Sequence, residues 1–329
     1  MVLRQGFQDS LDGFITPQGS LRYSADDEKT WQKLFDRGRR YSAWMHPAVI
    51  DGLTRLSLRR DQIPRIDVLA EKLRVIGWSA APVTGLLPSW AFFGFLSRRI
   101  FPVSIGLRDG RQLEFSPEPD LFHESFGHLP MLFDENYRDF VWKLATIASE
   151  NPVSSVIERR DRLVRELSHA LFRNADPTTI SQIRASIEAV PVEDELTPAE
   201  KAARLLWWVA EYGVQIGLKG EMKAFGGALI SSAGEMESLL ANDLVTEPIS
   251  QQCLALPYDP VAKVWKIFSL RNFSELDSLL MEVARTTEEE VSHRPEVQLN
   301  VSSLEPEAVP PIPMLISFSN INKEIQGVS

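Results

Sequence analysis

The stretch SPEPDLFHESFGH, residues 116–128, holds two of the five histidines in a chain of 329 residues. His123 and His128 are five residues apart, and Glu124 directly follows the first. Zinc proteases use His-Glu-x-x-His instead, because a spacing of four places both imidazoles on one face of an α-helix. Five residues advance an ideal helix by about 140° beyond one full turn. The two rings can therefore share a metal only if the helix loosens or ends near the second, which Gly127 permits. The alternative is a pair of histidines that are solvated or bonded to backbone.

A third ligand has to come from another part of the chain. The segment WWVAE, residues 207–211, carries an ionisable carboxylate, Glu211, among apolar neighbours. A buried glutamate without a partner is costly, and a metal at Glu211 would remove that cost. Two imidazoles and one carboxylate with open positions suit non-heme Fe(II) that activates oxygen. Spacing alone leaves a second interpretation open, in which Glu211 lies at the exposed edge of its helix.

Composition indicates a folded protein, with 44% hydrophobic and 24% charged residues. A net charge of −10 disfavours nucleic acid and anionic membranes as partners. The single cysteine, Cys253, excludes an internal disulfide and is most simply a small core residue. Residues 75–97 carry no charge, but Pro82, Gly85, Pro88 and Gly94 interrupt them, which predicts buried loop and short helix rather than a membrane span. Without an apolar run in residues 1–14, we expect a cytoplasmic protein.

The periodicity predicts a mainly helical fold with a few short strands. Helices are expected at about 25–38, after the capping box of Ser24 and Asp27, and from a cap at Asp67 to Val75, ended by Gly77. Further helices are expected at 136–149, at 155–172 and after the capping box of Thr197 and Glu200. Alternation predicts strands at 111–115, 252–256 and 264–268. We expect a flexible leader over 1–21, one catalytic domain over 22–287 and a proline-rich tail over 288–329.

Taken together, these motifs resemble those of the pterin-dependent aromatic amino acid hydroxylases, especially the bacterial phenylalanine 4-monooxygenases. The resemblance covers about residues 22–285. Its centre is residues 116–128, which match the histidine signature of the family in order and spacing. The other matching segments are VTGLLP (83–88), FF (92–93), RRIFPV (98–103), WWVAEYG (207–213) and KAFGGALISSAGE (223–235).

The resemblance implies a single catalytic domain of the aromatic amino acid hydroxylase type that binds one iron ion. It makes His123, His128 and Glu211 the Fe(II) ligands. The implied activity is hydroxylation of the ring of an aromatic amino acid, with a reduced pterin such as tetrahydrobiopterin as cofactor and O2 as co-substrate. The expected partner is a small aromatic amino acid, with no nucleic acid and no membrane; the oligomeric state is left open.

The same resemblance assigns roles around the metal. Arg108 and Ser116 would bind the substrate, and a bidentate guanidinium suits its carboxylate. Pro119 and Trp207 would form walls of the pocket for the substrate ring, and Ser231 would lie beside a ligand histidine as both a catalytic and a substrate-binding residue. The implied pterin contacts are Gly85, Leu86, Leu87, Phe92 and Glu124, of which Glu124 also faces the iron-bound water as a catalytic residue.

Three residues depart from the family pattern: Leu206 for a usual tyrosine, Tyr212 for a usual phenylalanine and Ala228 for a usual glycine. Trp207 favours phenylalanine as substrate, and the departures leave tryptophan or hydroxylation at the meta position as alternatives. Two other classes of function stay open. One is a zinc hydrolase with Glu124 as general base, and the other is a non-catalytic scaffold.

Overall fold

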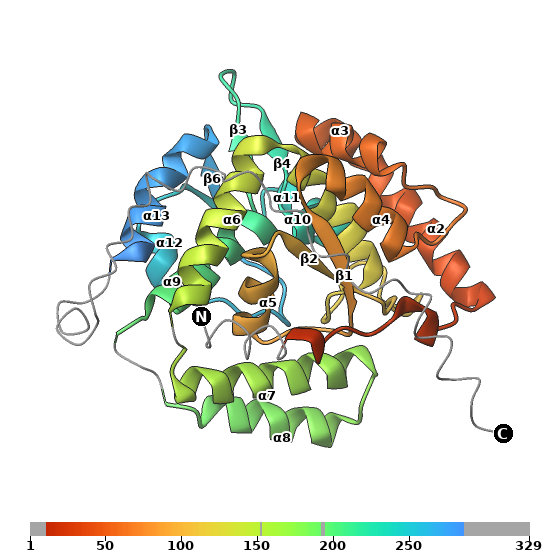
Figure 1. Ribbon diagram of the computed structural model, residues 1–329, viewed down its shortest axis with the longest axis horizontal. Helices are drawn as coiled ribbons and strands as arrows, with labels where there is room; N and C mark the ends of the chain where they lie inside the picture. Colours follow the sequence, from red (N-terminus) through yellow and green to blue (C-terminus); the bar gives the residue numbers. More distant parts are fainter. Residues whose placement is uncertain (1–10, 152, 192–194, 286–329) are drawn as a thin grey trace. The chain divides into compact units, whose positions relative to one another are not determined.

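The computed structural model describes residues 11–151, 153–191 and 195–285. Within them, helices surround two small sheets (Figure 1). The longer helices are α2 (Ala25–Arg40), α3 (Pro47–Leu56), α4 (Ile66–Leu73), α5 (Ser89–Leu96), α6 (Glu135–Glu150), α7 (Ser155–Phe172), α8 (Pro177–Glu188), α9 (Pro198–Leu206), α11 (Ala233–Leu240) and α13 (Asp277–Ala284). Two shorter helices are α10 (Gly227–Ser231) and α12 (Gln252–Ala255). The mainly helical prediction is confirmed. No helix in these residues is long and apolar enough to span a bilayer.

The strands form two separate sheets. In the first, β1 (Ser79–Val83) runs parallel to β2 (Ile100–Ser104), with Ser79 opposite Ile100. The second has the order β4-β3-β6-β5, built from β3 (Val214–Ile216), β4 (Met222–Ala224), β5 (Val245–Pro248) and β6 (Lys266–Leu270). In it, β3 and β4 are antiparallel, and β6 is parallel to both β3 and β5.

The capping boxes predicted from sequence form as expected. The Ser24 hydroxyl accepts from the Asp27 N–H at the start of α2, and Thr197 makes the same bond to Glu200 at the start of α9. Helix α6 buries one apolar face, including Phe140, Val141, Leu144, Ala145 and Ala148, and packs against α5 and α9. Cys253 is fully buried in the core.

Three local predictions are wrong. Arg65, and not Asp67, is the N-cap of α4, and Asp67 lies in the first turn as the partner of Arg65 in an ion pair. Residues 111–115 form no strand, because the Asp109 carboxylate accepts a hydrogen bond from the Arg111 N–H at 2.8 Å and closes a turn. Residues 252–255 are the short helix α12, in which the consecutive Cys253 and Leu254 are both buried. The prediction at 264–268 overlaps β6.

The first described residues pack against the body, although a flexible leader was expected over 1–21. Leu11 is buried beside Val83 and Phe95, and the Thr16 N–H donates to the Pro82 carbonyl at 2.8 Å. The Gln18 amide bonds to the backbone of Pro64 and Ile66. The domain boundaries at 21/22 and 287/288 stay predictions, and the tail over 288–329 lies outside the described residues.

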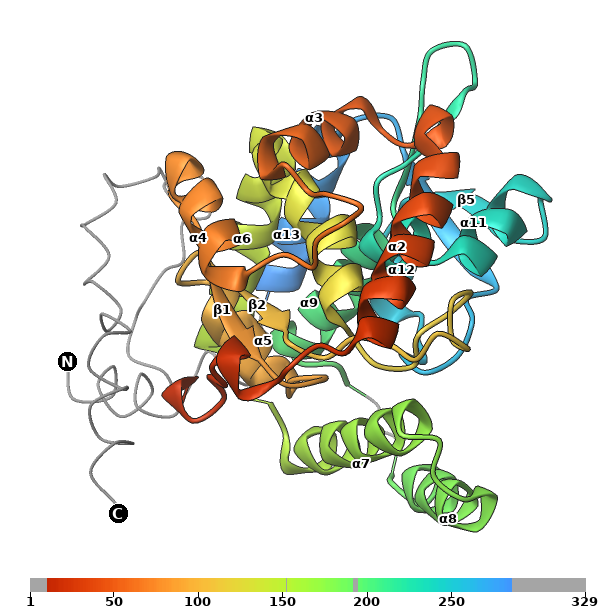
Figure 2. The ribbon, with the colours of Figure 1, turned by 90° about the vertical axis from the view of Figure 1, so that its right-hand side faces the viewer.

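Helices α7 and α8 form a pair that lies side by side beneath the sheet-bearing body (Figures 1 and 2). They share a small apolar cluster of their own, in which Leu167 of α7, Ile183 of α8 and Val261 are buried. This cluster packs α7 against α8 and against the loop that carries Val261.

Candidate functional site

The two histidines lie in a turn of π-helix, η4 (His123–His128). A π-helix bonds residue i to residue i+5, so residues five apart stack on the same face. This wider turn resolves the spacing that an α-helix cannot accommodate. Residue 127 of this turn is a glycine, and a Cβ there would lie 2.6 Å from the Gly227 carbonyl oxygen. The missing side chain therefore lets α10 pack directly on the turn. Glu211 ends a second π-helical turn, η6 (Trp207–Glu211).

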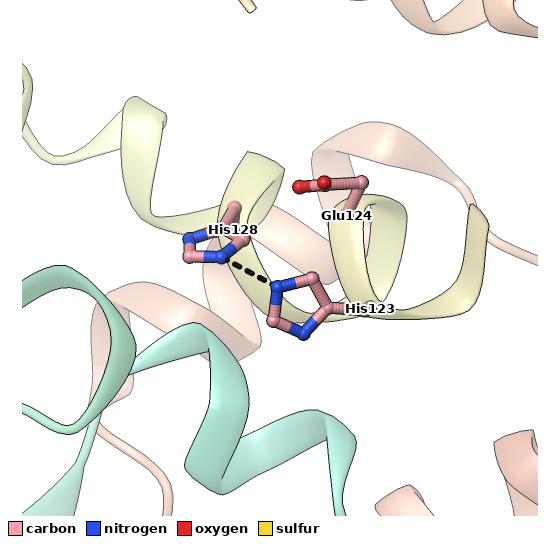
Figure 3. Close-up of side chains that lie close together, drawn as sticks. All are labelled: His123, Glu124 and His128. Atoms are coloured by element: carbon pink, nitrogen blue, oxygen red, sulfur yellow. Dashed lines mark hydrogen bonds between the residues drawn. The ribbon is translucent and has the colours of Figure 1, made fainter. Parts of the chain in front are cut away.

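Three candidate ligand atoms converge on one point. Nε2 of His123 and Nε2 of His128 lie 2.9 Å apart, as Figure 3 shows. Oε2 of Glu211 lies 3.0 Å from the His128 nitrogen and 3.5 Å from the His123 nitrogen. These separations are short enough for one ion, with metal–ligand bonds of about 2.1 Å, to contact all three atoms.

The donor set fits a cation. Oε2 of Glu211 is buried and has no hydrogen-bond partner among the described residues. Such an orphaned carboxylate oxygen is costly unless a cation balances it. Glu124 lies close to both rings, with its carboxylate within 4.8 Å of their nitrogens, and is the second carboxylate of this cluster.

Burial and mutual attraction set the charge of each ligand. Burial lowers the pKa of His123 to about 4, which keeps its ring neutral. Burial acts the same way on His128, but the Glu211 carboxylate outweighs it and raises the pKa of that ring. Burial disfavours the Glu211 anion, yet His128 and then His123 hold its pKa below the usual value. A histidine binds a metal through an unprotonated nitrogen, so metal binding at His128 would be favoured at higher pH.

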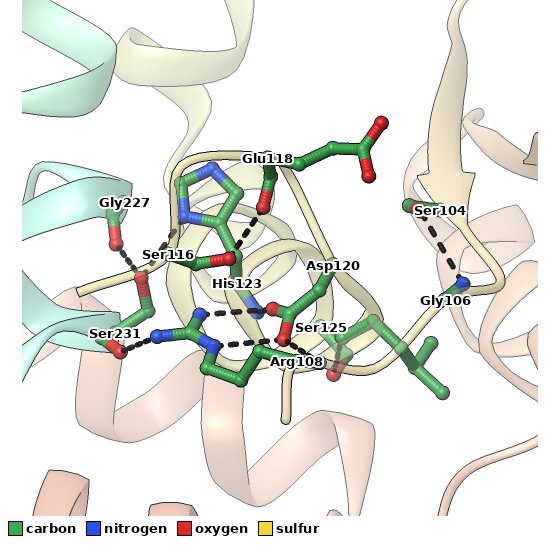
Figure 4. Close-up of polar contacts among 11 residues, drawn as sticks. Ser104, Gly106, Arg108, Ser116, Glu118, Asp120, His123, Ser125, Gly227 and Ser231 are labelled. Atoms are coloured by element: carbon green, nitrogen blue, oxygen red, sulfur yellow. Dashed lines mark hydrogen bonds and ion pairs between the residues drawn. The ribbon is translucent and has the colours of Figure 1, made fainter. Parts of the chain in front are cut away.

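Ser231 of α10 determines which His123 nitrogen faces the site. Its hydroxyl donates to the Gly227 carbonyl at 2.6 Å and lies 3.0 Å from Nδ1 of His123 (Figure 4). Because the only hydroxyl proton is already donated, the Ser231 oxygen accepts from Nδ1–H of His123. The neutral ring then has its lone pair on Nε2, the atom that points to the other ligands.

The α10 backbone also supports the second ring. A Cβ at Gly227 would lie 2.4 Å from the His128 imidazole. Only a residue without a side chain leaves room for this ring, so Gly227 reflects close packing of α10 on η4. Gly226 packs instead on the backbone of Glu211 and Gly213.

A cavity opens on the three candidate ligands and includes most of the other predicted site residues. Its walls contain Pro119 and Trp207, expected at the substrate ring, and the predicted pterin contacts Gly85, Leu86, Leu87, Phe92 and Glu124. Trp207 is held by stacking on Tyr258, with ring centroids 4.5 Å apart and an interplanar angle of 16°. Burial raises the pKa of Glu124 to about 8, so its carboxyl is predominantly protonated at neutral pH.

Arg108 lies outside this wall. Its guanidinium forms a bidentate pair with Asp120, through Nε–Oδ2 at 2.8 Å and Nη2–Oδ1 at 2.9 Å (Figure 4). Neither side chain is exposed. The third nitrogen, Nη1, lies 3.5 Å from the Ser231 carbonyl oxygen. Asp120 also accepts from the His123 N–H at 2.8 Å, so the pair supports the start of η4.

Two predicted substrate residues, Ser116 and Ser231, are likewise absent from the cavity wall. Ser116 donates its hydroxyl to the Glu118 carbonyl at 2.7 Å, which closes the loop before η4. The structure therefore gathers the metal, pterin and ring-pocket candidates around one cavity and places Arg108, Ser116 and Ser231 behind it.

Sequence reasoning missed one wall of the cavity. Asp161, Val164 and Arg165 of α7 line it, although the sequence predicted only a helix here and no part in the site. Their spacing of three and four residues places them on one helical face, which was the available signal. Tyr258 and Pro260 were also missed, and they lie in a loop without periodicity.

The three departures from the family pattern differ in position. Leu206 lines the cavity directly. Tyr212 is buried against Trp207, with ring centroids 5.2 Å apart. Ala228 lies in α10 next to Gly227 and is partly buried.

Comparison with known proteins identifies relatives of this chain. The family profile described as biopterin-dependent aromatic amino acid hydroxylase matches residues 16–163. Phenylalanine-4-hydroxylase from Chromobacterium violaceum is 37% identical over 143 residues, which cover 41% of this chain and 46% of that protein. The Mesorhizobium japonicum enzyme of the same name is 30% identical over 217 residues, 65% of this chain and 63% of its own length. The matches thus span about half to somewhat under two thirds of these curated relatives.

Solved structures match over more of the chain. A crystal structure of Chromobacterium violaceum phenylalanine hydroxylase, with bound iron(III) and 7,8-dihydrobiopterin, aligns with a TM-score of 0.62 at 25% identity. The alignment covers 82% of this chain and 86% of that one. The profile match, the bacterial relatives and the shared fold agree with the motifs around His123 and His128. Over residues 16–163 the chain is thus similar to the biopterin-dependent aromatic amino acid hydroxylases, and over most of its length it shares their fold.

Proposed function

We propose that this protein is an iron- and tetrahydropterin-dependent monooxygenase that hydroxylates the ring of an aromatic amino acid, with L-phenylalanine as substrate and tyrosine as product. The observation that carries the proposal is the convergence of His123, His128 and Glu211 at the cavity that Phe92 and Trp207 also line. Two imidazoles and one carboxylate leave ligand positions open on ferrous iron. When bound, the iron and the reduced pterin would supply the electrons and the site for dioxygen activation.

The residues of the chain bind and orient the reactants and exclude water. The aromatic surfaces of Phe92 and Trp207 suit flat rings, with Phe92 against the pterin and Trp207 with Pro119 against the substrate. Backbone and apolar groups of Gly85, Leu86 and Leu87 form the pterin side of the cavity. Ser231 holds His123 in the tautomer that binds metal.

Glu124 and Arg108 contribute charge and hydrogen bonding. The Glu124 carboxyl lies in the cavity wall, where it can form a hydrogen bond with the pterin or with a metal-bound water. Arg108 lies behind the cavity wall, where its pair with Asp120 supports the start of η4 and its Nη1 donates to the Ser231 carbonyl at 3.5 Å. Holding both reactants beside one ion supplies the proximity that the reaction needs.

The decisive experiment loads the full chain with Fe(II) without oxygen and then adds oxygen, tetrahydrobiopterin and L-phenylalanine. We expect oxygen uptake and formation of tyrosine, identified by mass spectrometry and NMR. Tyrosine and tryptophan as parallel substrates test the alternative substrate, and NMR distinguishes para from meta hydroxylation. Stoichiometric zinc with hydrolytic activity and no oxygen uptake would contradict the proposal.

A further inference from the structure

The loop between β1 and α5, residues 84–88, forms one side of the cavity through Gly85, Leu86 and Leu87. The loop is held in part by its own side of the fold: the Gly85 N–H donates to Ser104 Oγ at 3.3 Å, and Leu87 is buried in a small apolar cluster. Gly85 has a positive φ of 61°, and a side chain there would collide with Glu118 Oε1. These contacts leave the Leu86 carbonyl and the end of the loop to be held by another element.

Helix α7 supplies that support with two charged side chains one turn apart. Nε of Arg165 donates to the Leu86 carbonyl at 2.7 Å. The Asp161 carboxylate accepts from the Ser89 N–H at 3.2 Å and also from the Ser89 hydroxyl, at the first residue of α5. The two contacts fix the middle and the end of the loop, and hydrogen bonds to ionised groups are the stronger kind.

Helix α7 is itself held in place by contacts that do not involve the loop. Leu167 is buried against Ile183 of α8 and Val261. The buried Ser168 hydroxyl donates to the Pro117 carbonyl at 2.7 Å, which ties the helix to the stretch before the histidines. The family profile ends at residue 163, between Asp161 and Arg165, so it does not include the second of these contacts.

We infer that Asp161 and Arg165 are positioning residues for the pterin: by fixing loop 84–88 from α7, they set pterin affinity without contributing to amino acid affinity. The inference rests on the proposed function, because it assigns the pterin to this side of the cavity. Their hydrogen bonds go to the Leu86 carbonyl and to Ser89, so we expect an effect that does not depend on the substituent at C6 of the pterin.

The test measures binding of 7,8-dihydrobiopterin and 6-methyl-7,8-dihydropterin to the iron-loaded full chain by calorimetry, with L-phenylalanine titrated separately. Arg165→Met removes the donor to Leu86, and Asp161→Ala removes the one oxygen, Oδ2, that accepts both hydrogen bonds from Ser89. Each substitution is expected to weaken the binding of both pterins equally, with each dissociation constant raised by about tenfold. Phenylalanine affinity and iron content should stay within twofold of the wild type. Arg165→Lys, which keeps a charged donor, should recover part of the loss.

Arg162→Met is the matched control, because Arg162 is an exposed arginine on the same helix. It should leave both pterin affinities unchanged. A loss confined to 7,8-dihydrobiopterin would overturn the inference, since it would indicate direct contact with the C6 side chain. An equal loss of phenylalanine affinity, or no loss at all, would also overturn it. If the wild type binds iron but neither pterin, the proposed function itself fails.

Discussion

The Ser231 hydroxyl lies 3.0 Å from Nδ1 of His123, although the two residues are 108 positions apart in the chain. The contact couples α10 to the π-helical turn that carries the histidines. Because Ser231 already donates to Gly227, this contact selects the His123 tautomer with a free lone pair on Nε2.

Ser231→Ala should therefore weaken metal binding while leaving the fold intact. Loss of a hydrogen bond to a ligand histidine typically lowers metal affinity by about 10- to 100-fold. Competition with a chelator measures the Fe(II) affinity directly. Ser232→Ala, at the next position, serves as control, and equal affinities of the two variants would contradict the role of Ser231.

Replacing a ligand should abolish iron retention without unfolding the chain. We expect His123→Ala and Glu211→Ala to lose stoichiometric iron and turnover, because each removes one of three converging donors. Elemental analysis and circular dichroism check the two expectations separately. His169→Ala, at a half-exposed histidine, should retain iron. Full activity in a purified ligand variant would refute the assignment.

Gly227→Ala should both destabilise the protein and disturb the metal site. The added Cβ would lie 2.4 Å from the His128 ring, so the ring or α10 has to move. Overpacking of this kind costs about 1–3 kcal/mol. Urea unfolding measures the loss. Gly19→Ala is the control, because nothing lies within 4 Å of the added atom. A variant with wild-type stability and iron content would show that the packing is loose.

Breaking the Arg108–Asp120 pair should be strongly destabilising. Neither side chain is exposed, so removal of one partner leaves an uncompensated buried charge. Arg108→Ala is expected to lower the free energy of unfolding by about 3–5 kcal/mol. The double variant Arg108→Met/Asp120→Leu should lose less than the sum of the single losses in a double-mutant cycle. Additive losses would show that the two charges do not compensate each other.

Glu235 should make stability depend on pH. It is buried, and burial raises its pKa from the usual 4.5 to about 6. The folded chain holds this proton more tightly than the unfolded chain, so the stabilisation is complete below about pH 4.5 and is lost as pH rises through about 6. The shift corresponds to about 2 kcal/mol.

Glu235→Gln should remove this contribution, so its stability should fall less than that of the wild type between pH 4 and pH 8. Urea unfolding at both pH values measures the difference. Glu237→Gln, at an exposed position of the same helix, should keep the wild-type pH dependence. An unchanged pH dependence in Glu235→Gln would assign the effect to another group.

Local signals in the sequence anticipated the helices but not the sheets. The capping boxes at Ser24 and Thr197 and the apolar face of α6 are contained within a few turns, so periodicity finds them. Strands β1 and β2 pair in parallel and are almost entirely buried, so no polar alternation marks them. Asp109 redirects residues 111–115 into a turn through one hydrogen bond, which a pattern of apolar residues does not register.

In the candidate site, likewise, the sequence predicted the residues of local motifs but not the contacts between segments that are distant in the chain. Motifs identified His123, His128 and Glu211, and the structure brings their ligand atoms within 3.5 Å of one another. Arg108 lies behind the cavity wall because its guanidinium pairs with Asp120. The spacing of residues in the sequence does not reveal this pair. The wall from α7 was missed because it depends on how two distant segments pack.

The π-helical turn at His123–His128 makes the metal site sensitive to chain length. Such a turn holds one residue more than an α-helical turn would need. Deleting a single residue between the histidines would rotate the later side chains of the segment by about 100° around the helix axis. It would also reduce the spacing of the histidines to the four residues of a zinc-protease helix. In the π-helical geometry of this turn, a change of one residue would therefore move the His128 ring away from the face that carries His123.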